Sequence, residues 1–228
     1  MRSDSSWKAN IRTLTFDCYG TLIDWSAGLE QSLLAIFGDD FRRHQREFFD
    51  AYVDEEAKLE AGEYQSYRRV LAGCVQRLAE RFGLSFPASK ADDLAESLTS
   101  WKPFADTNDA LVALEKKFRL GVLSNIDRDL FRGTSKHFAV EFDFVITAED
   151  VRSYKPRLAH FQHMLATEGP VPQVLHVAQS LFHDGVPAQE LGLAFAWVNR
   201  YKQVNATSVR PTVEMPNLKS LAAMLCDS

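Results

Sequence analysis

The sequence has few cysteines, no long apolar run and no excess of basic residues. Its three cysteines, Cys18, Cys74 and Cys226, lack the spacing of a metal site and are an odd number, so we expect a reducing, cytoplasmic compartment. No run approaches the roughly 18 apolar residues of a membrane span. Residues 1–10 are polar, without the apolar centre of a signal peptide, and we expect a loose leader there. A net charge of −5 gives no reason to expect nucleic acid or an anionic membrane as a partner.

The rest of the chain is organised around the stretch from Ile11 to Asp24. Its first half is rich in aliphatic, β-branched and aromatic residues, which is typical of a strand buried between two helical layers. Asp17 follows this strand directly, and a glycine turn and Thr21 come next. Ligands of open parallel sheets bind just beyond the carboxyl ends of the strands, so Asp17 is a candidate functional residue. The alternative is a strand-terminal Asp that only caps the next turn.

From residue 25 to about 100 the periodicity is helical throughout. Apolar residues recur at helical spacing in four segments, 29–37, 41–58, 64–81 and 87–100. Strand patterns resume only after Trp101. The sequence therefore predicts an all-helical insertion, residues 25–100, in a domain that residues 1–24 and 101–228 form.

Beyond Trp101 strands alternate with helices. We expect strands at 120–124, 142–146, 174–177 and 193–198, a short extended piece at Val213 and helices between them. Such alternation indicates parallel βαβ units. The predicted fold class is α/β, a Rossmann-like doubly wound parallel sheet core with an inserted all-helical domain.

Polar residues follow several of the expected strands. Ser124 and Asn125, Lys155, and Asp184 join Asp17 at the ends of strands or in the loops just after them. Each has an ordinary explanation by itself: Ser124-Asn125 could cap a helix, Lys155 could be a solvated surface cation and Asp184 could begin a helix. Their coincidence at one edge of the sheet favours a single site.

The same segments resemble the motifs of the haloacid dehalogenase superfamily. Asp17-Cys18-Tyr19-Gly20-Thr21-Leu22-Ile23-Asp24 is similar to motif I, in the form that 2-haloacid dehalogenases of type II use. Leu123-Ser124-Asn125 resembles motif II, Tyr154-Lys155-Pro156 motif III, and residues 177–184 occupy motif IV. The resemblance covers residues 11 to about 200, and the helical insertion stands where the family's cap domain is inserted.

This resemblance implies hydrolytic dehalogenation of short 2-haloacids to 2-hydroxyacids through an aspartyl ester. It makes Asp17 the nucleophile and Lys155 the cation that keeps it ionised. Thr21, Ser124 and Asn125 would orient Asp17 and hold the substrate carboxylate, and Asp184 would orient Lys155 or the attacking water. Tyr19 and Gln179 would line the substrate pocket. A cap arginine would receive the halide; Arg42, Arg43 and Arg46 lie in the right region, and Arg46 is our candidate.

Two positions separate this chain from the superfamily's phosphatases. Tyr19 stands where they carry a second Asp, and Gln179 stands where they carry an Asp that helps to hold Mg²⁺. An amide is a weak ligand for a hard cation, so we expect no metal and no cofactor. Motif IV also departs from typical dehalogenases, which read Ser-x-Asn-x-x-Asp, because only Asp184 is kept.

Two other readings stay open. The first is a phosphatase, or another hydrolase of a carbon–heteroatom bond, on the same scaffold, which turnover of a phosphate ester with Mg²⁺ would favour. The second is a binding protein that inherited the fold without the chemistry, which the complete set Asp17, Thr21 and Lys155 disfavours. The expected partner is a small halogenated carboxylic acid. A homodimer, the preferred halide and the stereochemistry are left open by the sequence.

Overall fold

The structure, a computed structural model, describes residues 6–226 and contains a six-stranded sheet in the order β3-β2-β1-β4-β5-β6. Every neighbouring pair of strands is parallel. The strands are β1 (Thr13–Phe16), β2 (Arg119–Ser124), β3 (Phe144–Thr147), β4 (Val174–Ala178), β5 (Ala194–Val198) and β6 (Val213–Met215). The predicted α/β fold with a parallel sheet is confirmed.

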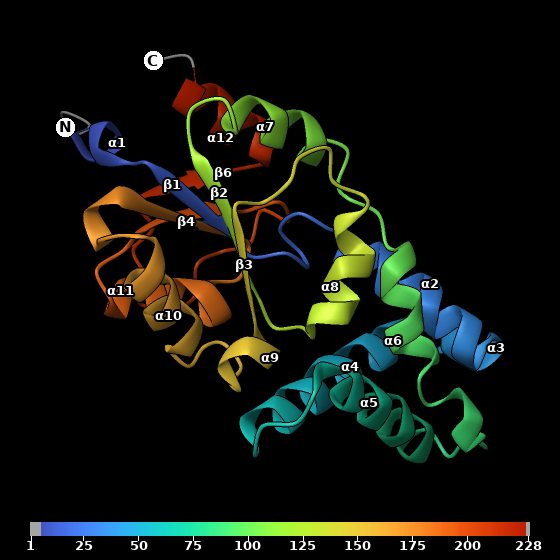
Figure 1. Ribbon diagram of the computed structural model, residues 1–228. Coiled ribbons are helices and arrows are strands. Elements are labelled where there is room, and N and C mark those ends of the chain that lie inside the picture. The colour runs from blue at the N-terminus through green and yellow to red at the C-terminus, as the bar shows by residue number, and fades with distance from the viewer. Residues whose placement is uncertain (1–5, 227–228) are drawn as a thin grey trace.

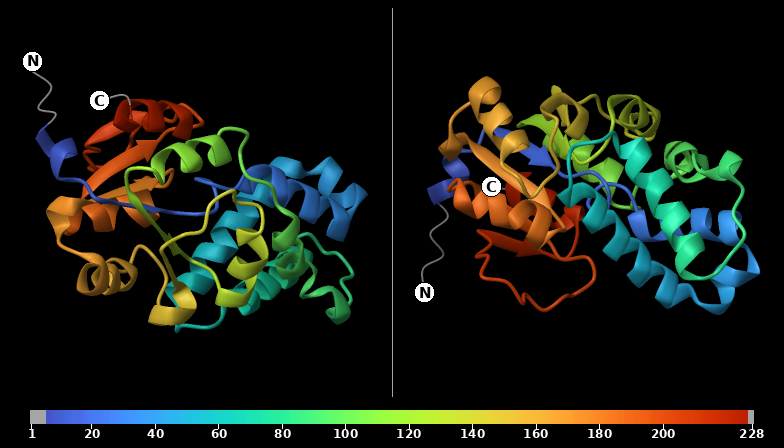
Figure 2. Two further views of the ribbon diagram at one scale, coloured as in Figure 1. Left: turned by 45° about the horizontal axis from the view of Figure 1, so that its top comes forward. Right: turned by 90° about the horizontal axis from the view of Figure 1, so that it is seen from below.

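Helices cover both faces of this sheet (Figures 1 and 2). α7 (Thr107–Leu114) and α12 (Leu218–Cys226) lie together on one face, and α10 (Ala159–Glu168) and α11 (Val186–Glu190) lie on the other. Because both faces of the sheet are covered, every residue of the central strands β1 and β4 is buried. At the N-terminus, where we expected a loose leader, the chain forms a short helix, α1 (Ser6–Asn10), and residues 1–5 lie outside the described residues.

Residues 25–100, between β1 and β2, contain helices and no strand, as predicted. They form α2 (Trp25–Phe37), α3 (Asp39–Arg43), α4 (Gln45–Ala61), α5 (Tyr67–Arg81) and α6 (Asp93–Ser97). The prediction of one helix over 87–100 was wrong, because this stretch is divided into η1 (Ala88–Lys90), α6 and η2 (Leu98–Ser100). The hydroxyls of Ser97 and Ser100 donate to main-chain carbonyls three residues earlier, which competes with a regular helix.

The two connections between this helical segment and the sheet domain run side by side. The amide of Asp24 donates to the Lys102 carbonyl at 2.9 Å. Trp101, at the return to the sheet, lies so close to α2 that a Cβ on Gly28 would stand 2.2 Å from its ring. The Trp101 indole also donates to the Ser32 hydroxyl at 3.0 Å. The arrangement is consistent with an inserted cap, while its boundaries at 24/25 and 100/101 stay a prediction.

A second set of contacts ties the far end of the helical segment to the sheet domain. The carboxylate of Asp127, just after β2, accepts from the amides of Tyr67 at 2.8 Å and Arg68 at 2.9 Å, at the start of α5. The Tyr154 hydroxyl donates to the Gln65 carbonyl at 2.8 Å. The loop between α4 and α5 is therefore held against the sheet domain.

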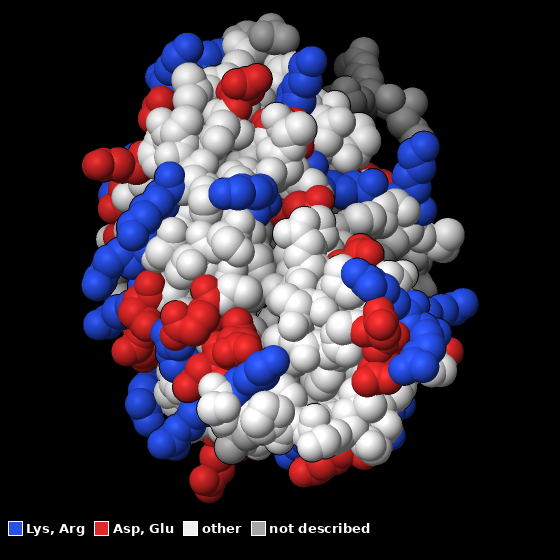
Figure 3. Space-filling view, turned by 90° about the vertical axis from the view of Figure 1, so that its right-hand side faces the viewer, with Lys and Arg blue, Asp and Glu red and all other residues white. Residues whose placement is uncertain are grey.

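The outward face of the helical segment carries acidic and basic side chains interspersed with one another (Figure 3). None of the helices within residues 6–226 is long and apolar enough to cross a membrane.

Candidate active site

The register of the central strands places Asp17 at the middle of the sheet's carboxyl edge. Phe16 pairs with Val122 of β2 on one side and with Val177 of β4 on the other. The chain leaves β1 toward β2 and later returns to its other side as β4, so the connections diverge here. This divergence is the topological switch point at which open α/β sheets bind their ligands.

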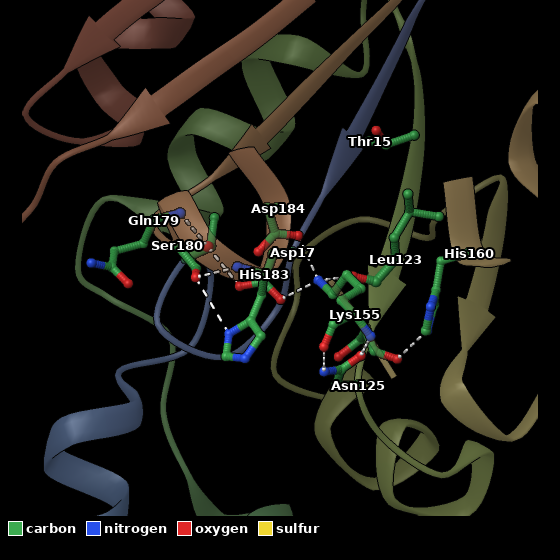
Figure 4. Close-up of polar contacts among 12 residues, drawn as sticks. Thr15, Asp17, Leu123, Asn125, Lys155, His160, Gln179, Ser180, His183 and Asp184 are labelled. Carbon is green, nitrogen blue, oxygen red and sulfur yellow. Dashed lines mark hydrogen bonds and ion pairs between the residues drawn. The ribbon is translucent and has the colours of Figure 1, made fainter. Parts of the chain in front are cut away.

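Lys155 holds the ends of three segments together (Figure 4). Its ammonium donates to Asp17 Oδ1 at 2.9 Å, to Asp184 Oδ1 at 2.6 Å and to the Leu123 carbonyl at 2.8 Å. These acceptors use all three of its protons. Only 2% of Lys155 is exposed, so it is not the solvated surface cation that the sequence left open.

The Asp17 carboxylate is fixed through both oxygens. Oδ1 accepts from Lys155, and Oδ2 accepts from the Thr21 hydroxyl at 2.8 Å. Thr21 reaches back because Gly20 adopts a φ of 92°, which favours glycine and turns the chain sharply. The Thr21 oxygen in turn accepts from the Gln179 amide at 2.9 Å. The nucleophile candidate is thus held in one orientation by neighbours from two loops.

The three central charges have pKa values that follow from burial and from one another. Burial raises the pKa of Asp17, although Lys155 opposes that shift. Burial also acts to raise the pKa of Asp184. Lys155 and the His176 hydrogen bond outweigh burial and hold this pKa well below its usual range. Burial disfavours the ammonium of Lys155, yet Asp17 and Asp184 raise its pKa. Lys155 therefore stays protonated at neutral pH.

Asp184 does not begin a helix, as one sequence reading had it. It lies within a π-helical turn, Leu181–Gly185, and α11 begins only at Val186. The Ser180 hydroxyl accepts from the His183 amide at 3.0 Å and closes this turn, which carries Asp184 into the protein interior. There its Oδ1 lies 2.9 Å from His176 Nε2.

His176 is a residue that the sequence reasoning missed. Its Nδ1 lies 2.8 Å from the Thr15 hydroxyl in the adjacent strand, so both of its ring nitrogens are engaged. The one signal in the sequence was a histidine within the otherwise apolar run of β4, and in the structure this histidine is fully buried. It positions Asp184 from behind.

Ser124 and Asn125 follow β2 and play different parts. The Ser124 hydroxyl, at the cavity wall, has no hydrogen-bond partner within residues 6–226 and is free to receive a ligand. Asn125 clasps the Lys155 peptide: its Oδ1 accepts from the Lys155 amide at 2.7 Å and its Nδ2 donates to the Lys155 carbonyl at 3.1 Å. Burial and Lys155 lower the pKa of His160 to about 3, so neutral His160 donates to the Ser124 carbonyl at 3.2 Å.

These groups open into a cavity of about 520 Å³ between the sheet edge and the helical segment. The residues predicted for the site that line it are Asp17, Tyr19, Ser124, Asn125, Lys155, Gln179 and Asp184. The helical segment contributes residues that the sequence did not point to, namely Trp25, Ser26, Val53, Glu56, Glu60 and Tyr67. Thr21 stands behind Asp17 rather than in the wall.

Tyr19 and Gln179 occupy the wall as neutral groups. The Tyr19 hydroxyl is 2.6 Å from the Thr134 hydroxyl of α8 (Arg128–Ser135), and the Gln179 amide donates to the Gln203 side chain at 3.0 Å.

The structure does not bring Arg46 to the cavity. Its side chain is 92% exposed and lies 3.9 Å from Asp50. Arg46 and Glu60 are at opposite ends of α4, about 21 Å apart at 1.5 Å per residue. The salt bridges of Arg42 with Asp39 and of Arg43 with Asp40 are likewise exposed.

The donor set does not fit a Mg²⁺ ion. The two carboxylates that the sheet domain contributes to the cavity, Asp17 and Asp184, are already bridged by the Lys155 ammonium, and Gln179 offers an amide. On the helical side, Glu56 already accepts from the Tyr52 and Tyr67 hydroxyls. Within residues 6–226 no group of three or more His, Cys, Asp or Glu side chains is arranged to hold a metal. A hard cation requires several charged oxygen ligands, which this arrangement does not supply.

The chain has full-length relatives among dehalogenases. The (S)-2-haloacid dehalogenase of Pseudomonas fluorescens is 25% identical over 226 residues, which cover 96% of this chain and 98% of that protein. The solved L-2-haloacid dehalogenase from Xanthobacter autotrophicus aligns with a TM-score of 0.81 at 19% identity, over 94% of this chain and 98% of that one. YfnB from Bacillus subtilis, solved bound to magnesium, aligns with a TM-score of 0.82 at 19% identity, over 95% and 99%.

The structural likenesses show the fold. A family model described as haloacid dehalogenase-like hydrolase matches residues 11–178, which is most of the chain and includes motifs I to III and the start of motif IV. The expected superfamily is therefore confirmed, and the chain belongs to the haloacid dehalogenase-like hydrolases.

Proposed function

We propose that this protein hydrolyses the carbon–halogen bond of a short 2-haloacid through an ester on Asp17. The observation that carries the proposal is the Asp17 carboxylate, held by Lys155 and Thr21 at the floor of a cavity. A carboxylate that is fixed and shielded from water attacks carbon without first shedding a hydration shell. The full-length similarity to (S)-2-haloacid dehalogenases supports this substrate class.

In the first step an Asp17 oxygen forms a bond to C2 of the substrate, and the halogen leaves with the bonding electron pair. Lys155 compensates the charge of Asp17 before attack, and the Ser124 hydroxyl is free to hold the substrate carboxylate. Water then attacks the ester carbonyl of Asp17 and releases the 2-hydroxyacid. The helical segment, residues 25–100 in our prediction, acts as the cap that excludes bulk water.

A single turnover in H₂¹⁸O, with enzyme in excess, tests this route. The first product should be mostly unlabelled, because its new oxygen comes from Asp17, and the peptide that contains Asp17 should gain ¹⁸O. If Asp17 or Asp184 instead activated water to attack carbon directly, the product would be labelled at once and no carboxylate would be. If ¹⁸O were found on Asp184 instead, Asp184 and not Asp17 would be the nucleophile.

A metal-dependent phosphatase is the second candidate, because YfnB shares the fold and was solved bound to magnesium. Phosphoryl transfer needs positive charge around the phosphate oxygens. Among the described residues that line the cavity, Lys155 is the only lysine or arginine, and two carboxylates already share it. This charge balance favours the dehalogenase.

A further inference from the structure

The cap side of the cavity presents acids where the sequence reasoning expected a cation. Glu56 and Glu60 lie one turn apart on α4, and both line the cavity that contains Asp17. No arginine or lysine of the described part of the cap lines it. A departing halide therefore needs another partner on this side.

The two glutamates have different partners. Glu56 Oε1 accepts from the hydroxyls of Tyr52 and Tyr67, both at 2.7 Å, and two such donors stabilise a carboxylate. Glu60 receives one long contact, from Asn125 Nδ2 to Oε2 at 3.3 Å. The Asn125 amide cannot turn over without losing its bonds to Lys155, so this contact is an N–H donated to Glu60. Burial raises the pKa of Glu56 as well, but its two phenol donors oppose that shift, whereas the pKa of Glu60 is raised further; Glu56 is therefore the member that carries the charge.

The surroundings of Glu60 favour its neutral form. The side chain is buried, with only 8% exposed, and it stands in the last turn of α4, where the helix dipole disfavours a negative charge. Burial, and next the Glu56 carboxylate, raise the pKa of Glu60 well above its ordinary value.

Two cations, Lys155 and Arg157, lower the pKa of Glu60, but less strongly than burial raises it, and each is hydrogen-bonded to other groups. The Lys155 ammonium has its three acceptors in the sheet domain. The Arg157 guanidinium donates to the Ala61 carbonyl at 2.7 Å. The other titratable groups near Glu60, the phenols of Tyr67 and Tyr154 and the thiol of Cys74, have pKa values raised by burial and are uncharged.

We propose that Glu60 takes part in the reaction as an uncharged carboxylic acid that donates a hydrogen bond to the departing halogen. The proposal rests on the dehalogenation proposed above. Asp17 attacks from the sheet side, so the halogen leaves toward the cap. As the Asp17–carbon bond forms and the carbon–halogen bond breaks, the electron pair goes to the halide, and the Glu60 O–H points to it. The proton stays on Glu60, and the free acid takes the place of a cap cation.

The dependence of the rate on the leaving group tests this role. We expect Glu60→Ala to slow single turnovers of chloroacetate about 10–100-fold, the size of one hydrogen bond to a charged group, and those of iodoacetate much less, because iodide needs less stabilisation. Glu60→Gln keeps an N–H donor and should lose less. It should also abolish the fall of the wild-type rate at alkaline pH. Glu63→Gln, an exposed acid close by in the chain, is the matched control.

Equal losses for both halides, or an unchanged alkaline limb in Glu60→Gln, would overturn the proposal. A leaving-group dependence that Trp25→Phe changes and Glu60→Ala does not would also overturn it, since the Trp25 indole is another donor among the cap residues that line the cavity.

Two measurements without turnover separate this proposal from the proposed function. The infrared difference between wild type and Glu60→Gln at pH 7 should show the carbonyl stretch of a protonated carboxyl. Bromide should bind the wild type about tenfold more tightly than Glu60→Ala, in a titration followed by tryptophan fluorescence. If wild type released no halide from any haloacid, the proposed function would fail. If Glu60 were ionised at pH 7, or if wild type and Glu60→Ala bound bromide equally, only the proposed role of Glu60 would fail.

Discussion

The Lys155 ammonium lies 2.9 Å from Asp17 Oδ1, although 138 positions separate the two residues in the chain. Each is buried and would be costly alone, because an unpaired charge in the interior loses its hydration without compensation. The pair is therefore a single unit, and the fold must bring β1 and the loop before α10 together to make it.

Replacement of Lys155 is expected to abolish turnover. Lys155→Ala leaves two facing carboxylates without a cation, so a proton would settle on one of them, and kcat should fall by several orders of magnitude. Lys155→Arg should rescue poorly, because a planar guanidinium cannot reproduce three bonds from one nitrogen. Single-turnover halide release measures the loss of rate, and circular dichroism checks that each variant is still folded. Near-normal rates in both variants would remove Lys155 from the mechanism.

Activity should survive exhaustive chelation. Tyr19 and Gln179 stand where metal-dependent relatives have acids, and Lys155 bridges the two remaining carboxylates. Halide release should be the same before and after treatment with EDTA and after addition of Mg²⁺. Loss of turnover in EDTA that Mg²⁺ restores would revive the phosphatase.

The acid limb of kcat/KM should report Asp17. Attack needs the carboxylate, and burial raises the pKa of Asp17 above the ordinary value of 3.8. The rate should therefore fall, as pH is lowered, sooner than it would for an exposed aspartate. Thr21→Val removes a hydrogen bond that lowers this pKa and should move the limb to higher pH. The exposed Thr167→Val is the control, and a limb that Thr21→Val leaves in place would contradict the assignment.

Glu60 should make stability depend on pH in a direction opposite to that of an ordinary ion-paired acid. Its folded-state pKa lies above the ordinary value of 4.5. Its contribution to the free energy of unfolding is thus complete below about pH 4.5 and is lost as pH rises through the folded-state pKa. Glu60→Gln has no such loss, so urea unfolding should show its advantage over wild type growing across this window. If the difference in free energy of unfolding between wild type and Glu60→Gln did not change with pH, the pKa of Glu60 would be the same in the folded and unfolded states.

The contact between α2 and Trp101 leaves no room for a side chain at position 28. Gly28→Ala would place a Cβ 2.2 Å from the indole ring, and the shift this forces should lower the free energy of unfolding by about 1–3 kcal/mol. Gly62→Ala is the control, since its Cβ would meet only the Leu59 carbonyl at 3.5 Å. Equal stabilities of the two variants in urea would show that Trp101 moves freely.

Local pattern was enough for the sheet and for the residues at the ends of its strands. The apolar run before Asp17 and the alternation after Trp101 predicted a parallel sheet, and parallel strands bring their carboxyl ends to one edge. Strand ends were predicted well because an apolar strand that runs into a polar loop is a sharp signal.

The cap side of the site could not be predicted in the same way. Whether a glutamate of α4 faces solvent or a cavity depends on how the helix packs against distant segments, and period alone does not supply this. Arg46 and Glu60 show the difficulty, because both lie on α4 and only the one at its C-terminal end meets the sheet. His176 escaped for a related reason, since its partners Thr15 and Asp184 come from other parts of the chain.

Asp127 links the cap to the sheet domain at the start of α5. Although it precedes α8, its carboxylate caps the first amides of α5, so one end of a cap helix is completed by a residue of the sheet domain. Separating the cap from the sheet domain would remove Asp127 from these amides at a cost of about 1 kcal/mol and would leave Ser66 as the side-chain cap of α5. This contact would therefore oppose any movement that opened the cavity by separating the two domains.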